Sequence, residues 1–356
     1  MTTRHLVCAV LAAPFLCAQD AKAKPEMPNP KVQSHEALAM LAGDWQCTCK
    51  MAAMPGVPGM EAASEWTGTE HAELICNGLW LKSSIDSKSK DQTFRGCWLM
   101  GYDPIKSKYV GIWVSSHDEP SSTSEGTFDE ATKSWTFRGR SPMGEFRSVY
   151  ACKDANNSIE TCYATGADGK ESECMQIVRT RIKGGIAKDA SSTVAPIEAA
   201  EPPTLAKEHA LLAEGTGRWD AVVTTKAPGQ DATEEKGTEH VIPICDGKWT
   251  WSDFKGTMMG MPFEGHALTG YESDTKRFVS YWIDCCSPHF SKVTGTYDAA
   301  KKVFTFSGTC IDMNGKPATI QQVYAVADKN TRNLTMTMSG ADGTQEMKIA
   351  YKRTGD

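Results

Sequence analysis

Hydrophobic and polar residues alternate along most of this chain in short runs, separated by Gly, Asp, Asn and Pro. Such alternation with turn residues at the ends is typical of β-strands joined by tight turns. The clearest example runs from Gly265 to Phe306, where the chain turns at 272–276 and again at 298–302. Almost no segment has helical periodicity, so the pattern predicts an all-β, antiparallel sandwich or barrel.

The same pattern of hairpins occurs twice. Glu70-His71 matches Glu239-His240, and Trp113 matches Trp282, each pair being 169 residues apart. Trp45 and Trp219 are 174 residues apart, and the difference falls in a loop rich in Met, Pro and Gly. Insertions that are confined to loops leave strand spacing intact. We therefore interpret the chain as a tandem duplication of one ancestral unit.

Each unit begins with a short apolar segment, His35–Leu41 in the first and Lys207–Ala213 in the second, which predicts a short helical lead-in. Pro- and Ala-rich sequence with no aromatic residue separates the units, as in an interdomain linker. The predicted divisions are a signal peptide (1–23), a spacer (24–34), a first barrel repeat (35–182), an Ala/Pro-rich linker (183–206) and a second barrel repeat (207–356).

One strand of each unit is apolar on both faces. A free-standing barrel keeps one face of each strand in water. We therefore expect the second face of this strand to be covered, either by the lead-in helix or by the other unit. Tyr109, Gly111, Trp113 and Ser115 alternate with Val110, Ile112 and Val114, and Phe278, Ser280, Trp282 and Asp284 alternate with Val279, Tyr281 and Ile283. The face with large and small residues is expected to point inward.

Composition excludes some partners. The net charge is −6, which gives no basic surface for nucleic acid. No apolar run reaches the roughly 20 residues of a membrane span. The N-terminus has Arg4 and His5, an apolar run at 6–16 and a small-x-small site at 21–23, with Ala18 as a second cleavage candidate. This pattern predicts a secretory signal peptide and a secreted or periplasmic protein. A lipoprotein at Cys17 and an unprocessed tail are the alternatives.

Cysteine usage agrees with export. Of 13 cysteines, two lie in the predicted signal peptide, which leaves an odd number. At least one thiol is then free or forms an intermolecular disulfide. Cys162 and Cys174 flank the turn at 167–169 symmetrically, so we predict a disulfide between them, with Cys152 as a competing partner.

Cys285-Cys286-Ser287-Pro288-His289 offers soft ligands for a thiophilic metal. Structural zinc usually takes four ligands in two closely spaced pairs, and that spacing is missing here. We therefore expect one disulfide partner and one buried thiol at this position, and we predict no metal and no cofactor.

The repeated motifs resemble those of a bacterial family of unassigned function, domain-of-unknown-function family 1579. The second unit carries them most fully, as Met259–Gly265, Gly270-Tyr271, Tyr281–Asp284, Gly295–Asp298 and Gly340–Gly343. The resemblance covers nearly all of the mature chain. It implies a calycin-like antiparallel barrel, similar to lipocalins and fatty-acid-binding proteins, and it brings no assigned activity.

Candidate ligand contacts are the repeated polar and aromatic residues. Adjacent strand residues point to opposite faces, so only one member of each Glu-His pair faces inward. Surface pairing of these residues and core packing of the aromatic ones are the alternatives. The candidates are Glu70, His71, Tyr102 and Trp113 in the first unit, and Glu239, His240, Tyr271 and Trp282 in the second.

These patterns predict an exported tandem barrel that holds a small apolar ligand in one or both units. The alternative is a structural or interaction module whose barrels are filled by side chains. No nucleophile-base order, phosphate-binding loop or paired-carboxylate motif stands out, which disfavours an enzyme. Polar groups that converge at a barrel mouth would still permit one.

Overall fold

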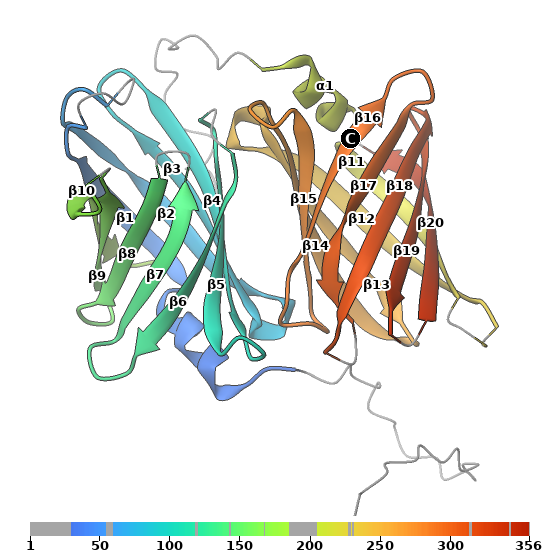
Figure 1. Cartoon of the computed structure of the whole chain (residues 1–356), viewed down its shortest axis with the longest axis horizontal. Helices are drawn as coiled ribbons and strands as arrows, with labels where there is room; N and C mark the ends of the chain where they lie inside the picture. The colour runs from blue at the N-terminus through green and yellow to red at the C-terminus, as the bar shows by residue number, and fades with distance from the viewer. Residues whose placement is uncertain are drawn as a thin grey trace, which may run out of the picture.

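The alternating segments form two closed β-barrels in the computed structural model of the chain (Figure 1). The structure describes residues 30–355, apart from 55–59, 118–119, 142–143, 167, 185–204, 227–228, 230, 313–314 and 342. Within these residues, each barrel has ten antiparallel strands in sequence order, and its last strand pairs with its first. The all-β tandem-barrel prediction is confirmed. The predicted signal peptide and most of the predicted linker lie outside the described residues.

The first barrel follows the 3₁₀-helix η1 (Gln33–Met40). Its strands are β1 (Gly43–Met51), β2 (Ser64–Ile75), β3 (Trp80–Lys88), β4 (Thr93–Asp103), β5 (Lys108–Ser115), β6 (Ser122–Asp129), β7 (Ser134–Ser141), β8 (Gly144–Cys152), β9 (Asn157–Thr165) and β10 (Glu171–Arg181). A single 3₁₀ turn, η2 (Cys76–Gly78), joins β2 to β3.

The second barrel follows the α-helix α1 (Lys207–Glu214). Its strands are β11 (Gly217–Lys226), β12 (Thr233–Ile244), β13 (Trp249–Met258), β14 (Met261–Glu272), β15 (Arg277–Asp284), β16 (Ser291–Asp298), β17 (Val303–Ile311), β18 (Pro317–Asp328), β19 (Thr331–Gly340) and β20 (Gly343–Gly355). The turn η3 (Cys245–Gly247) occupies the place that η2 has in the first barrel.

Each lead-in helix closes one end of its own barrel. The Trp45 indole donates to the Leu41 carbonyl at 2.9 Å, and the Trp219 indole donates to the Gly215 carbonyl at 3.2 Å. In the first barrel, the Arg181 guanidinium stacks 4.0 Å from the Trp45 ring and donates to backbone carbonyls at the end of η1. Arg353 does the same in the second barrel. The closed ends are therefore built alike.

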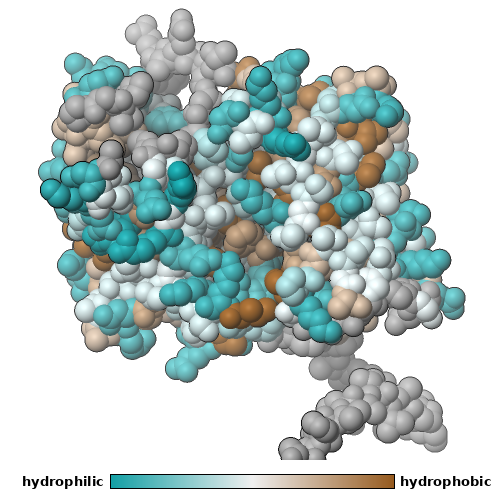
Figure 2. Space-filling view, viewed as in Figure 1, coloured by the Kyte–Doolittle hydropathy of each residue, from teal (hydrophilic) through white to brown (hydrophobic). Residues whose placement is uncertain are grey.

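The two barrels pack side by side through β3–β5 and β13–β15 (Figure 1). Val110, Ile112 and Val114 share one buried cluster with Val279, Tyr281 and Ile283. This confirms that the second face of the doubly apolar strand is covered, and the cover is the other barrel. The helix η1 lies at the lower end of its barrel and α1 at the upper end of the other, so the barrels are antiparallel (Figure 1). The visible surface is mainly hydrophilic to neutral, with small separate apolar patches (Figure 2).

Polar contacts surround this interface. Arg95 of β4 forms an ion pair with Asp246 of η3. The Ser121 hydroxyl donates to the Glu272 carboxylate at 2.6 Å. The His289 ring lies 3.1 Å from Asp103. The interface thus combines a buried apolar centre with a polar rim, which favours one fixed arrangement of the barrels.

Candidate ligand sites inside the two barrels

The interior of each barrel changes from its closed end to its open end. Next to η1, the inward side chains of Trp45, Tyr109 and Trp135 are at most 3 % exposed. Toward the other end of the first barrel, many inward side chains are half-buried, although Trp66 of β2 is only 8 % exposed. The half-buried ones are Cys49, Met51, Phe94, Trp113, Phe146, Cys162, Met175 and Ile177. Solvent therefore reaches inward side chains of the open end, and beside η1 it also reaches Tyr102 and Phe128.

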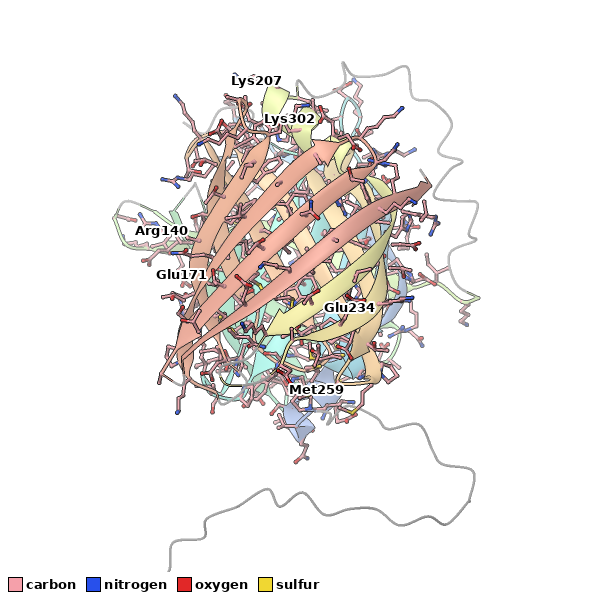
Figure 3. The ribbon with its side chains drawn as sticks, turned by 90° about the vertical axis from the view of Figure 1, so that its right-hand side faces the viewer. Arg140, Glu171, Lys207, Glu234, Met259 and Lys302 are labelled. Atoms are coloured by element: carbon pink, nitrogen blue, oxygen red, sulfur yellow. The ribbon has the colours of Figure 1, made fainter. Side chains whose placement is uncertain are left out.

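The second barrel has the same gradient. At the end closed by α1, Trp219 and Phe278 are at most 3 % exposed. Inward residues farther along β19, Leu334 and Met336, are half-buried. Lys207 and Lys302 mark the closed end, and Glu234 and Met259 mark the opposite end (Figure 3).

A buried ion network crosses the middle of the first barrel. The Arg179 Nε donates to the Glu70 carboxylate at 2.6 Å, and its Nη2 donates to Glu160 at 2.9 Å. Arg179 is 2 % and Glu70 is 3 % exposed. The Ser148 hydroxyl donates to Glu160 at 2.6 Å, and the Tyr150 ring lies 4.7 Å from the guanidinium carbon. Buried charges of this kind persist only when they are paired.

The second barrel has a related network around Glu239. Arg332 forms an ion pair with this carboxylate, and the Ser252 hydroxyl also donates to it. The Arg332 guanidinium carbon lies 4.7 Å from the Tyr351 ring and 5.3 Å from the Tyr324 ring. Burial is the main reason that the pKa of Tyr324 rises well above its usual value. Glu239 and Tyr324 correspond to Glu70 and Tyr150.

The two arginines come from different strands. Ser158 of β9 pairs with Arg179 of β10, whereas Arg332 of β19 pairs with Tyr351 of β20. The same cross-strand pair thus carries its arginine on the last strand in the first barrel and on the strand before it in the second barrel. Comparison of the two halves at a constant offset does not reveal this, so both arginines were missed from the sequence. The signal that could have revealed them is the presence of an arginine in one of the last two strands of each unit.

Each arginine also keeps one nitrogen without a partner. Arg179 Nη1 and Arg332 Nε are buried and have no hydrogen-bond acceptor among the described residues. A buried donor with no acceptor costs about 1–3 kcal/mol. Beyond Arg179, the next inward residues of β9 and β10 are half-buried. The unpaired donor of Arg179 therefore lies on a side chain next to half-buried inward residues, whereas Arg332 also reaches the closed end, where its Nη1 donates to the Gly215 carbonyl.

Stacked aromatic rings line the open ends. Phe94 and Trp113 are stacked with ring centres 6.0 Å apart, and Trp66 meets Phe94 edge-on at 6.3 Å. Phe263 and Trp282 are stacked at 6.5 Å in the second barrel. A glycine lies beneath each tryptophan, because a Cβ at Gly96 or Gly265 would come within 2.4 Å of its ring. Both barrels thus present a broad aromatic wall.

Three inward positions carry cysteine in the first barrel but not in the second. Cys47, Cys49 and Cys162 point inward, where the second barrel has Ala221, Val223 and Met336. Burial raises the pKa of Cys47 to about 12 and that of Cys49 to about 11. Burial also raises the pKa of Cys162. These thiols remain protonated at neutral pH and act as small, polarisable apolar groups.

The structure separates the predicted ligand contacts. Trp113 and Trp282 lie at the open ends, and Glu70 and Glu239 lie in the middle. Tyr102 and Tyr271 lie at the closed ends, where their rings meet the lead-in histidines, His35 at 5.7 Å and His209 at 5.9 Å.

His71 and His240 lie on the opposite strand face from their glutamates, so they do not line the barrels. The His71 ring is exposed and lies 2.6 Å from the Asp44 carboxylate. Strand alternation separates these two histidines from Glu70 and Glu239 and places them outside the barrel interiors.

The predicted disulfide between Cys162 and Cys174 is not formed in this structure. All 11 described cysteines are free thiols. The hairpin register starts as the sequence symmetry requires, but a bulge between Glu173 and Met175 shifts it by one residue. Met175 therefore faces Cys162, and the Cys174 sulfur lies 3.3 Å from the Cys162 carbonyl oxygen instead.

The alternative metal site at 285–289 is not assembled. The His289 ring contacts Asp103 of the first barrel. Among the described residues, no group of three or more His, Cys, Asp or Glu side chains is arranged to hold a metal ion. No helix of the described chain is long and apolar enough to cross a membrane.

Two hollows lie outside the barrels. One of about 510 Å³ adjoins η1 and is lined by the predicted ligand contact Tyr102, by Tyr109 and Phe128, and by Glu36, Glu130 and Lys133. Another of about 420 Å³ includes Lys106, Lys108 and Phe290. Both are open to solvent, and the smaller one is the richer in charged side chains.

One family model matches the chain twice. The family model described as "Protein of unknown function (DUF1579)" matches residues 30–181 and 204–353, one match for each barrel. No curated protein matches the chain.

Similar solved structures include the S-type phycobiliprotein lyase CPES of Guillardia theta, with 9 % identity, TM-score 0.34, and coverage of 43 % of this chain and 94 % of that one. Rv2717c of M. tuberculosis has 12 % identity and TM-score 0.35, with 42 % and 99 % covered. A DUF3598 protein of unknown function from Nostoc punctiforme has 9 % identity and TM-score 0.23, with 91 % and 100 % covered.

Proposed function

This chain belongs, through both of its barrels, to the DUF1579 family of proteins of unknown function, and we propose that it binds a small, mainly apolar molecule in the open end of each barrel. The ligand carries one hydrogen-bond acceptor, which reaches the buried arginine. The aromatic wall contacts its apolar body.

The unpartnered guanidinium nitrogens carry this proposal. Arg179 Nη1 and Arg332 Nε each lack an acceptor, although each arginine is at most 4 % exposed. The same deficiency occurs in both barrels, although the arginines come from different strands. An oxygen atom on a ligand would supply the missing acceptor, and the accessible open end provides a route to it. Ligand pockets commonly combine apolar walls with a few polar groups of this kind.

The ligand is uncharged or only weakly anionic at the first site. Arg179 already has Glu70 and Glu160 as partners, so one positive charge faces two carboxylates. A further full negative charge would be repelled there. A carbonyl, hydroxyl or amide oxygen fits this environment better than a carboxylate does.

We further propose that the protein is exported. The charged and apolar N-terminus and the small-x-small site support this assignment. In the exported form, both open ends would meet extracytoplasmic solutes.

A structural module with filled barrels is the second candidate. The aromatic filling of the closed ends and the large apolar contact between barrels favour it. The two candidates differ in one respect, because only the binding protein needs its open ends free.

Titration of the full mature chain with N-phenyl-1-naphthylamine, a dye that fluoresces in apolar sites, tests the proposal. Ala164→Phe fills the open end of the first barrel, and Met338→Phe fills the equivalent position in the second. We expect saturable binding by the native chain, a partial loss in each variant and a loss of roughly ten-fold or more in affinity in the double variant. Saturable binding that the double variant leaves unchanged, or no binding by the native chain, would favour the filled module.

A further inference from the structure

The loop after β15 contains two adjacent cysteines, Cys285 and Cys286, that the ligand proposal does not use. Their sulfur atoms lie 3.6 Å apart. Cys285 is 2 % exposed and belongs to the core between the barrels, whereas Cys286 is half-buried. The sulfurs are therefore close enough to react with each other, and the more exposed residue is Cys286, so a small solute reaches Cys285 from the Cys286 side.

The first barrel has a serine at the position that corresponds to Cys285. Its equivalent residue is Ser116, whose backbone N–H donates to the Arg95 carbonyl at 2.8 Å and whose hydroxyl accepts from the Arg95 N–H at 3.0 Å. Cys285 keeps both contacts in the second barrel, with the Glu264 carbonyl at 2.9 Å and the Glu264 N–H at 3.4 Å. A thiol has replaced a hydroxyl in a preserved backbone setting.

The Glu264 N–H donates to the Cys285 sulfur, and the Cys286 thiol lies within hydrogen-bond reach of it, where it donates when Cys285 is a thiolate. Hydrogen bonds to the charged form of a group favour that form. The Cys286 thiol, more than the other contacts, lowers the pKa of Cys285 to about 7. The same hydrogen bond raises the pKa of Cys286. The arrangement thus provides a thiolate beside a protonated thiol, whereas burial raises the pKa of the cysteines that point into the first barrel.

The backbone around the pair is held in place. One oxygen of Asp284 accepts the N–H groups of Cys286 at 2.8 Å and Ser287 at 2.9 Å. The other oxygen accepts the Trp282 indole N–H at 2.9 Å. These bonds keep the two sulfurs together before any reaction occurs.

We propose that Cys285 and Cys286 form a peroxide-reactive dithiol that closes to a disulfide between adjacent residues. The Cys285 thiolate attacks one oxygen of hydrogen peroxide, which gives a sulfenic acid and releases hydroxide. The Cys286 sulfur then attacks the Cys285 sulfur, its proton leaves with the hydroxyl group as water, and the S–S bond forms. Overall, two thiols and one peroxide give one disulfide and two waters.

Oxidation of the folded, full-length chain with one equivalent of hydrogen peroxide at pH 7 tests this inference. Peptide mass spectrometry would follow the loss of two hydrogens from the peptide that contains both cysteines, and its reversal by dithiothreitol. Cys310 is half-buried in the same barrel, and burial raises its pKa, so it serves as the internal reference. We expect Cys285 to react roughly ten-fold or more faster than Cys310.

Two variants separate the roles of the thiols. In Cys286→Ser the sulfenic acid has no resolving thiol, so dimedone should trap it on Cys285. Cys285→Ser restores the residue type that the first barrel has at Ser116 and should abolish the fast reaction. Equal rates at Cys285 and Cys310, a disulfide from Cys285 to any other cysteine, or undiminished fast oxidation in Cys285→Ser would overturn the proposal.

Discussion

The two barrels share their closed ends but differ in what surrounds the central arginine. In the first barrel, Glu160 and inward thiols lie around Arg179. In the second, Leu334 occupies the position of Glu160, and Arg332 instead donates to the Gly215 carbonyl at 2.9 Å. Closure by a helix, a tryptophan and an arginine is thus the common requirement of this fold, while the chemistry of the interior has diverged.

This divergence shows which interaction the barrel must retain. The carboxylates of Glu70 and Glu239 occupy equivalent positions and each pairs with an arginine, yet the arginine has moved from one strand to its neighbour. Breaking a buried pair by removal of one partner costs about 3–5 kcal/mol. The arginine can occupy either of two residues that face each other on neighbouring strands and still form the ion pair with the glutamate. The ion pair is therefore retained, although the position of the arginine in the sequence is not.

The largest expected effect comes from removal of the central carboxylates. Glu239→Ala leaves Arg332 without a carboxylate partner and should lower the free energy of unfolding by about 3–5 kcal/mol. Glu70→Ala should cost less, because Arg179 keeps Glu160. Urea denaturation of both variants measures this. Equal costs in the two barrels would contradict the assigned role of Glu160.

The next effect concerns the interface that joins the barrels. Leu99 and Leu268 are equivalent and at most 1 % exposed in the shared cluster. Leu99→Ala or Leu268→Ala should each cost about 2–5 kcal/mol. Because the cluster belongs to both barrels, each variant should lower the midpoint of both. Calorimetry should therefore show one shifted transition, whereas a shift confined to one of two separate transitions would argue against the shared core.

A smaller effect is expected from transfer of the second arrangement into the first barrel. Ser158→Arg and Arg179→Tyr each disturb the network alone, while together they recreate the pairing of Arg332 with Tyr351. A double-mutant cycle in urea should give a favourable coupling of about 1–3 kcal/mol. Additive losses would show that the two networks are not interchangeable.

The smallest effect should be a pH dependence peculiar to the second barrel. His266 lies between Asp253 at 2.8 Å and Glu264 at 3.2 Å, where the first barrel has Cys97. Burial opposes its charge, but the interactions with the Asp253 and Glu264 carboxylates outweigh burial and raise the pKa of His266 above its usual value of 6.5.

The sign of this effect follows from the raised pKa. A raised pKa in the folded state stabilises the protein fully below pH 6.5, and the contribution is lost as the pH rises through the folded-state value. Unfolding measured from pH 6 to pH 9 should show this loss in the native chain but not in His266→Gln. Identical pH profiles for the two proteins would contradict the assignment.

Much of this architecture could be predicted from the sequence, because alternation and repetition report directly on strands and copies. The doubly apolar strand at Val110–Val114 indicated that its second face is covered, although the sequence left open whether the lead-in helix or the other barrel covers it. Cross-strand register was less accessible. The bulge near Met175 displaced Cys174, and the arginine exchange escaped notice because it requires knowledge of which residues of β9 and β10 face each other. Alternation along one strand shows which face of the sheet a residue points to, whereas the residue that faces it on the next strand depends on the register between the strands.

Native mass spectrometry of the mature chain purified from its natural source tests the central claim most directly. The account predicts bound small molecules, up to one for each barrel, that are retained by the native chain and lost from the Ala164→Phe and Met338→Phe double variant. A folded native chain that carries no small molecule, together with an identical spectrum for the double variant, would contradict binding in the open barrel ends.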